Sequence, residues 1–365
     1  MRVSRALVAL AAAAAVLPFV PLASASSGDV VITVLSSRAD LVSSGDALVA
    51  VSLPAGAHGL RVTAGSRDIT KAFAQRADGQ VRGLVTGLPL GSTVLTARVA
   101  GGRGARLTLV DHAIGGPVFA GPQIQPWTCA AGTRGPQCNA KPTYAYRYLP
   151  AGGSGTPGQA VGNQSPLQRY DPANPPPAPL IATTTTQTGA KVPFIVRTET
   201  GYMDRDQYSI SALYQPGKPW SGVNPQSQFN HKLVLTHGAS CDTEYRSASA
   251  PDTLNVAALG AGFVVASHAL DNAGHDCNLA VQAEALYMTK ERVIEQYGTL
   301  RYTIGSGCSG GSLVQQQVAN AYPGMYQGIS PQCSFTDAWS SAQQYVDYLM
   351  LLKYFEDPTR WDAGS

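Results

Sequence analysis

The chain has 365 residues, a formal net charge of +3 and only 13% charged residues. So small a charge excludes a strong basic field, and we therefore expect no binding to nucleic acid or to an anionic membrane surface. Low charge with 38 glycines and 25 prolines favours a secreted, loop-rich protein, and the length suffices for two domains.

Residues 1–25 are predicted to be a signal peptide. Two arginines precede an alanine-rich apolar run, and Ala23-Ser24-Ala25 is typical of a cleavage site. A membrane anchor is the alternative, but the run is short and is interrupted by Pro18 and Pro21. We therefore expect an extracellular protein without stable membrane insertion. Loss of the two arginines leaves a charge of +1 (+3 − 2).

The chain has six cysteines. In an exported protein an even number indicates disulfides, although six cysteines permit fifteen pairings. No Cys-x-x-Cys occurs, so a zinc site is the weaker interpretation, and we expect no metal and no cofactor. The first two cysteines are close enough in sequence to close one small loop. The predicted disulfide residues are Cys129, Cys138, Cys241, Cys277, Cys308 and Cys333.

Residues 26–112 are predicted to form a small β-sandwich of the immunoglobulin type. Apolar and polar residues alternate in five runs that are separated by turn signals: 30–34, 47–53, 60–64, 94–99 and 105–110. His58 and His112 are expected at the surface or at strand ends, and nothing in this module indicates catalysis. Packing against the rest of the chain is its expected role.

Residues 113–190 are predicted to be an irregular connecting segment, because they are rich in glycine and proline and lack periodicity. Aromatic residues such as Trp127 and Tyr146 indicate that part of the segment is packed.

Residues 191–365 are predicted to form a mostly parallel α/β sheet followed by the start of a cap. Runs at 192–199 and 208–214 indicate an opening hairpin, and buried strands are expected at 232–236, 262–267, 300–304 and 325–330. Helices are expected around 253–259, at 281–297 with Gly298 as C-cap, from 311, and at 338–355.

The sequence Gly307-Cys308-Ser309-Gly310-Gly311 lies between a predicted strand and a predicted helix. This Gly-x-Ser-x-Gly pattern places a serine on a sharp turn, so Ser309 is our candidate nucleophile. The backbone N–H of Gly310 is a candidate oxyanion donor. A second donor is expected from Gly238 or Ala239, in the turn after the strand at 232–236. The alternatives are a glycine-rich loop with an ordinary serine and a simple glycine turn.

These motifs resemble the nucleophile elbow and the His-Gly turn of the α/β-hydrolase superfamily over residues 192–335. The Gly-Cys-Ser elbow is similar to that of secreted tannases and feruloyl esterases. The whole sequence looks like large secreted bacterial hydrolase-like proteins of unassigned activity. The resemblance implies an α/β-hydrolase fold, and ester cleavage through an acyl-serine.

The strand order of these hydrolases has a consequence for the cysteines. It would place the strand that ends at Thr236 beside the strand that ends at Ser267, so that Cys241 meets Cys277. It would likewise bring Cys308 to Cys333. In tannases the cysteine before the nucleophile pairs with one that follows the catalytic histidine, and no histidine follows Ser309 here.

All six histidines precede Ser309, whereas the hydrolase order is serine, acid and then histidine. We therefore expect a truncated product that lacks the histidine and the acid. Asp337 is a candidate acid. His268 or His275 as an upstream base is a weaker alternative, and a metal site in their loop is weaker still.

The predicted function is a secreted serine hydrolase that acts on small-molecule or polymeric carboxylic esters and is inactive or incomplete in this form. An amidase or peptidase would use the same machinery. The alternative from another class is a non-catalytic binding or cell-surface protein with a degenerate hydrolase fold.

Overall fold

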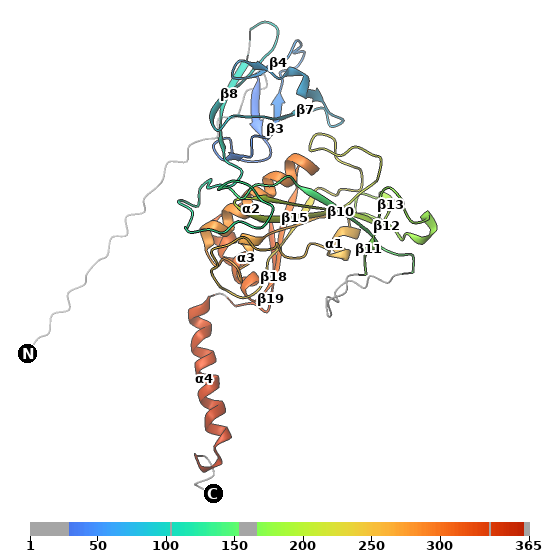
Figure 1. Ribbon diagram of the computed structural model, residues 1–365. Helices are drawn as coiled ribbons and strands as arrows, with labels where there is room; N and C mark the ends of the chain where they lie inside the picture. The colour runs from blue at the N-terminus through green and yellow to red at the C-terminus, as the bar shows by residue number, and fades with distance from the viewer. Residues whose placement is uncertain (1–28, 103, 153–165, 336, 361–365) are drawn as a thin grey trace, which may run out of the picture.

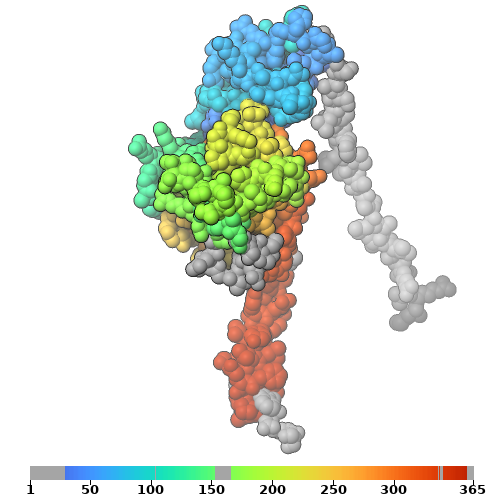
Figure 2. All heavy atoms as spheres, turned by 90° about the vertical axis from the view of Figure 1, so that its right-hand side faces the viewer, coloured from blue at the N-terminus to red at the C-terminus, as the bar shows by residue number. Residues whose placement is uncertain are grey.

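The computed structural model describes residues 29–360, except residue 103, residues 153–165 and residue 336. The predicted signal peptide, residues 1–25, lies outside the described residues. The described chain forms an all-β unit, an α/β unit and a projecting helix (Figure 1). In Figure 2 the all-β unit, in blue, lies at one end of the molecule and the projecting helix, in red, extends from the other.

Residues 31–112 form two sheets that pack face to face, which we call the sandwich. Within the described residues the strand orders are β1-β3-β7-β6 and β2-β9-β8-β4-β5. Side chains from both sheets meet in the core, where Val49, Leu95 and Leu109 are fully buried. The strands are β1 (Val31–Val34), β2 (Val42–Ser43), β3 (Ala47–Ser52), β4 (Arg61–Ala64), β5 (Arg67–Asp68), β6 (Phe73–Gln75), β7 (Val81–Val85), β8 (Gly91–Arg98) and β9 (Gly104–His112).

The α/β unit is built on a sheet whose order in the described chain is β11-β10-β14-β15-β17-β16-β18-β19. Its strands are β10 (Thr143–Tyr148), β11 (Gln168–Arg169), β14 (Ile195–Met203), β15 (Asp206–Leu213), β16 (Lys232–Thr236), β17 (Val264–His268), β18 (Tyr302–Cys308) and β19 (Gly328–Gln332). A separate hairpin joins β12 (Thr183–Thr185) to β13 (Lys191–Pro193).

The sheet is mixed, and the prediction of a mostly parallel sheet was wrong. Pairing is antiparallel from β11 through β10, β14 and β15 to β17. It is parallel from β17 through β16 and β18 to β19. The reason is that β10 and β11, from the segment expected to be irregular, extend the opening hairpin with further antiparallel strands.

Helices cover both faces of this sheet. They are α1 (Val256–Gly260), α2 (Leu279–Tyr297) and α3 (Gly310–Ala321). Leu233 and Leu235 of β16 face the core under α2 and α3, whereas Val234 faces the core under α1. This alternation follows the two-residue period of a strand.

The limits of α2 follow from its sequence. The side chain of Asn278 caps the helix by accepting hydrogen bonds from the N–H groups of Ala280 and Val281. Gly298 ends it at φ 121°, a conformation that favours glycine. The predicted limits of this helix are therefore close to the observed ones.

The sandwich and the connecting segment are both attached to α2. Glu291 accepts hydrogen bonds from the N–H and the hydroxyl of Ser43 in the sandwich, at 3.2 and 2.5 Å. Glu284 accepts from three successive backbone N–H groups of the segment, those of residues 118–120. α2 is thus the scaffold that fixes both parts to the main sheet.

Helix α4 (Ala338–Glu356) projects away from the α/β unit (Figure 1). Apolar side chains between Tyr345 and Phe355 are 39–68% exposed. A helix that is apolar on most of its sides is normally buried. Among the described residues no helix is both long and apolar enough to cross a membrane.

Candidate active site

Ser309 lies at a sharp turn between β18 and α3. Its backbone has φ 57° and ψ −118°, a strained left-handed conformation for a residue with a side chain. The N–H of Ser309 donates to the carbonyl of Gln332 at 3.0 Å, and its own carbonyl accepts from the N–H groups of Ser312 and Leu313. Strand, strained serine and helix therefore follow one another as in a nucleophile elbow.

Glycines around Ser309 allow the loop after β16 to approach the elbow closely. A side chain at Gly310 would overlap the carbonyl oxygen of Ser240. A Cβ at Gly311 would lie 2.8 Å from the carbonyl oxygen of Gly238, again closer than real contacts. The strand pairing explains the approach, because Thr236 of β16 lies beside Ser306 of β18.

The predicted oxyanion donors are the N–H groups of Gly310, Gly238 and Ala239. No described residue accepts a hydrogen bond from any of the three. Gly310 is also the first residue of α3, where the helix dipole favours a negative charge. The elbow thus has unused donors near the serine, which is what a developing oxyanion requires.

Disulfides join the loops that surround the elbow. Cys308, directly before Ser309, is bonded to Cys333, directly after β19. Cys241 is bonded to Cys277, which links the loop after β16 to the residues before α2. Together with Cys129–Cys138, these are the pairs expected from the sequence.

The histidine nearest to the elbow in the fold is His237, which directly follows β16. Its Nε2 lies 3.0 Å from the hydroxyl of Tyr326, and its Nδ1 faces Asp271 Oδ1 at 3.4 Å. Burial raises the pKa of the Asp271 carboxyl, and His237 opposes part of this shift. Both nitrogens of this imidazole therefore face groups other than Ser309.

His268 and His275, the upstream alternatives, are also engaged. His268 Nε2 bonds to the carbonyl of Met203, and its Nδ1 accepts from the N–H of Leu270. Burial lowers the pKa of His268 to about 3, so its ring is neutral. His275 lies between two carboxylates, 2.9 Å from Asp206 and 3.2 Å from Glu244.

These contacts also affect the pKa of His275. Burial lowers the pKa of its imidazole, but the carboxylates of Asp206 and Glu244 outweigh burial and raise it. Both ring nitrogens face carboxylates, so neither is directed at Ser309. The sequence singled out the loop of His275, but it gave no sign of these two partners.

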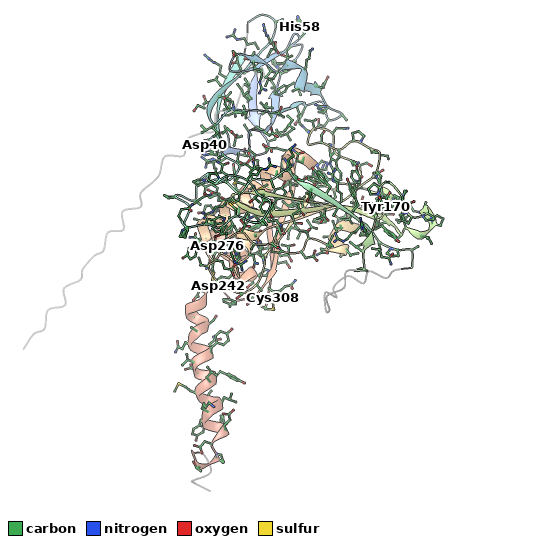
Figure 3. All side chains as sticks on the ribbon, viewed as in Figure 1. Asp40, His58, Tyr170, Asp242, Asp276 and Cys308 are labelled. Atoms are coloured by element: carbon green, nitrogen blue, oxygen red, sulfur yellow. A yellow bond between two sulfur atoms is a disulfide. The ribbon has the colours of Figure 1, made fainter. Side chains whose placement is uncertain are left out.

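The remaining histidines bond to backbone carbonyls: His58 to Gly56, His112 to Asp40 and His231 to Thr299. Figure 3 shows His58 at the end of the sandwich that is farther from Cys308. Among the described residues, no histidine ring reaches the Ser309 hydroxyl. The structure therefore brings together the candidate nucleophile and donors, but none of the described histidines joins them.

Asp337, the candidate acid, is the N-cap of α4. Its carboxylate accepts from the N–H of Ser340 at 2.6 Å and from the hydroxyl of Ser340 at 2.8 Å. A capping role accounts for these contacts. Within the described ranges, no group of three or more histidine, cysteine or acidic side chains is arranged to hold a metal ion.

Comparisons with solved structures give weak matches. Feruloyl esterase B from Aspergillus oryzae is 14% identical with a TM-score of 0.27, over 52% of this chain and 32% of that chain. Another esterase from Aspergillus oryzae is 10% identical with a TM-score of 0.25, over 52% and 33%. Oligopeptidase B from Leishmania major is 10% identical with a TM-score of 0.27, over 86% and 43%. The match thus spans about a third of each esterase and less than half of the oligopeptidase.

The sequence has no match among curated proteins. One family model, however, matches residues 32–364, which is nearly the whole chain. The chain therefore belongs to the Tannase-like family of unknown function (DUF6351).

Proposed function

We propose that this protein is a serine hydrolase that cleaves carboxylic esters, with Ser309 as the nucleophile. The observation that carries the proposal is the strained backbone of Ser309, at φ 57° and ψ −118° between a strand and a helix. Such strain persists where the surrounding structure enforces it, and it exposes the hydroxyl at the edge of the sheet. Membership of a tannase-like family supports an esterase-type activity.

The geometry suits acyl transfer in two steps. The Ser309 oxygen attacks the ester carbonyl and loses its proton to a base, and the carbonyl oxygen becomes an oxyanion. The N–H groups of Gly310 and of Gly238 or Ala239 stabilise that charge. The intermediate collapses to an acyl-serine, the alcohol leaves with the proton, and water then releases the acid.

The base is assigned to polypeptide outside the described residues. Two observations support this: each histidine ring of the chain bonds to another described group, and α4 exposes an apolar surface that other residues would cover. The acid is assigned to the same polypeptide or to Asp337, which would then give up its capping contacts. This chain alone is therefore proposed to be incomplete as a catalyst.

An extracellular location is part of the proposal. The disulfides support it, because such bonds persist in oxidising compartments. The substrate is proposed to be a small-molecule or polymeric ester.

Covalent labelling tests the proposal. The full-length gene product is treated with a fluorophosphonate probe, and peptide mass spectrometry locates the adduct. We expect one adduct on Ser309, and its complete loss in Ser309→Ala. Ser334→Ala, which removes an exposed hydroxyl just beyond Cys333, is the matched control and should label normally. Absence of an adduct at Ser309 would overturn the enzyme proposal and favour a binding protein.

A further inference from the structure

A cavity of about 1010 Å³ lies where the sandwich, the connecting segment, the main sheet and α2 meet. Ser44 of the sandwich and Arg292 of α2 border it, and residues 132–143 of the connecting segment form much of its wall. Its volume is at the upper end of the range for small-molecule sites. The described parts of the chain thus contain a ligand-sized cavity that the proposed ester chemistry does not use.

The cavity and Ser309 lie at the same end of the strands of the main sheet, but they are far apart. Met203, the last residue of β14, lines the cavity, and β18 leads into Ser309. β14 and β18 are separated by β15, β17 and β16. With strands about 4.8 Å apart, four steps give a separation of roughly 19 Å. The cavity is therefore a separate site.

The wall of the cavity is mainly apolar. Ile114 and Pro142 come from the connecting segment, and Tyr202, Met203 and Tyr208 come from the hairpin of β14 and β15. Aromatic and aliphatic side chains of this kind accommodate a flat ring. The Tyr208 hydroxyl is already used, because it donates to Glu199 at 2.8 Å.

The charged side chains that line the cavity are all positive. Among the described residues that line it, Arg134, Lys141 and Arg292 are cationic and none is acidic. Arg292 is paired with Glu199 at 2.9 Å. Arg134 and Lys141 are exposed and form no ion pair with any described residue. The cavity therefore offers two uncompensated positive charges beside an apolar wall.

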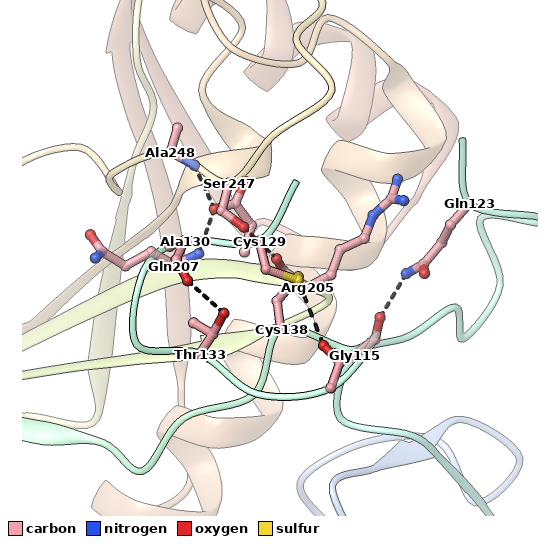
Figure 4. The surroundings of a disulfide bond; sticks show 12 residues. Gly115, Gln123, Cys129, Ala130, Thr133, Cys138, Arg205, Gln207, Ser247 and Ala248 are labelled. Atoms are coloured by element: carbon pink, nitrogen blue, oxygen red, sulfur yellow. Dashed lines mark hydrogen bonds between the residues drawn. A yellow bond between two sulfur atoms is a disulfide. The ribbon is translucent and has the colours of Figure 1, made fainter. Parts of the chain in front are cut away.

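One of these cations lies on a braced loop. Arg134 lies in the loop that the Cys129–Cys138 disulfide closes, and its backbone exchanges two hydrogen bonds, at 2.7 and 3.0 Å, with that of Asn139 just after the loop. Figure 4 shows this disulfide close to the β14–β15 hairpin at Arg205. A braced loop loses little backbone freedom when a ligand binds.

We propose that this cavity binds a small organic carboxylate with a ring-sized apolar body. The carboxylate pairs with Arg134 and Lys141, and the ring packs against Ile114, Met203 and Tyr202. This inference goes beyond the proposed ester hydrolysis and does not depend on Ser309.

The test is a fluorescence titration of the full chain with 2-naphthoate and with its neutral analogue 2-naphthalenemethanol. We expect saturable binding of the carboxylate, at least several-fold tighter than that of the alcohol. Arg134→Gln and Lys141→Gln should each weaken naphthoate binding roughly five-fold and leave alcohol binding unchanged, as for a partly exposed ion pair. Added salt should weaken only the carboxylate.

Matched controls separate this proposal from general charge effects and from catalysis. Lys191→Gln removes an exposed cation on β13, outside the cavity, and should bind naphthoate normally. Ser309→Ala should also bind it normally, so failure of the hydrolase proposal would not affect this result. Equal affinity for acid and alcohol, or unchanged binding in the Arg134→Gln/Lys141→Gln double variant, would overturn the proposal.

Discussion

The elbow and the junction between the sandwich and α2 are both energetically unfavourable, but for different reasons. At the elbow the cost is conformational, since Ser309 adopts φ 57°. At the junction, which we define as Asp46, Asp111, Glu291 and Glu295 with Ser43, the cost is the burial of carboxyl groups. A disulfide and close-packed glycines hold the elbow in place, whereas protonation of the buried carboxyl groups lowers the cost of burying them at the junction. The two regions should therefore respond to different perturbations.

The pKa values of the junction show this cost. Burial raises the pKa of Asp111 to about 6 and that of Glu291 to about 7, although hydrogen bonds from Ser43 oppose the shift of Glu291. Burial and the neighbouring acids raise the pKa of Glu295 well above its usual value. Arg292 lowers the pKa values of Asp46 and Glu295 only in part, and it is paired with Glu199.

The largest effect is expected from removing the disulfide beside Ser309. Cys308→Ala/Cys333→Ala opens a loop with a sequence separation of 25 and should lower the free energy of unfolding by about 3 kcal/mol in urea denaturation. Cys129→Ala/Cys138→Ala, with a separation of 9, should cost less. An equal or smaller loss for the elbow pair would contradict this account.

Gly310→Ala tests the close approach at the elbow. Because an added side chain would overlap the Ser240 carbonyl, we expect the free energy of unfolding to fall by between about 2 and 3 kcal/mol, and the full-length gene product to lose fluorophosphonate labelling. Gly328→Ala is the control, because a Cβ there meets nothing within 4 Å and the backbone is not left-handed. Similar losses in both variants would show that the elbow is not specially constrained.

The junction should make stability fall as the pH rises. The folded-state pKa of Glu291, about 7, exceeds its usual value of 4.5, so the folded protein holds this proton more tightly than the unfolded chain does. The resulting stabilisation is fully present below about pH 4.5 and is lost as the pH rises through 7. Glu291→Gln, which imitates the protonated acid, should reduce the loss between pH 5 and 8 on the order of 2 kcal/mol. If the melting temperatures of the two proteins change with pH in the same way, this role of Glu291 is disproved.

The smallest effect is expected at Glu295. One of its oxygens has no hydrogen-bond partner among the described residues, and its carboxyl faces Glu291 and Asp46. Burial and the neighbouring acids favour the protonated form, so Glu295→Gln should change stability least in acid and should stabilise the protein by about 1 kcal/mol as the pH is raised. Thermal melts over a pH series measure this, and destabilisation that grows with pH would count against the proposed repulsion.

The elbow could be predicted because its signal is local. A strand, a Gly-x-Ser-x-Gly turn and a helix follow one another in sequence, and Cys308 and Cys333 flank ends of neighbouring strands. The environment of His275 could not be predicted in this way. Its partners Asp206 and Glu244 lie 69 and 31 residues away, and only the sheet order brings them together.

Two of the observed strands were not predicted, for physical reasons. β10 is rich in tyrosine, which suits a strand, but the glycines and prolines around it obscured the signal. β7 contains Gly83, which interrupts the alternation of apolar residues. That glycine is required because a Cβ there would lie 2.8 Å from the ring of Phe73.

The exposed surface of α4 has a practical consequence for work with this chain. Tyr345, Tyr348, Met350 and Phe355 are each more than 60% exposed on a single projecting helix. In water such a surface attracts other apolar surfaces, including detergents, hydrophobic dyes and further copies of the chain. Particle sizes measured on a purified sample, for example by light scattering, would therefore reflect association through this helix more than the properties of the sandwich and the α/β unit.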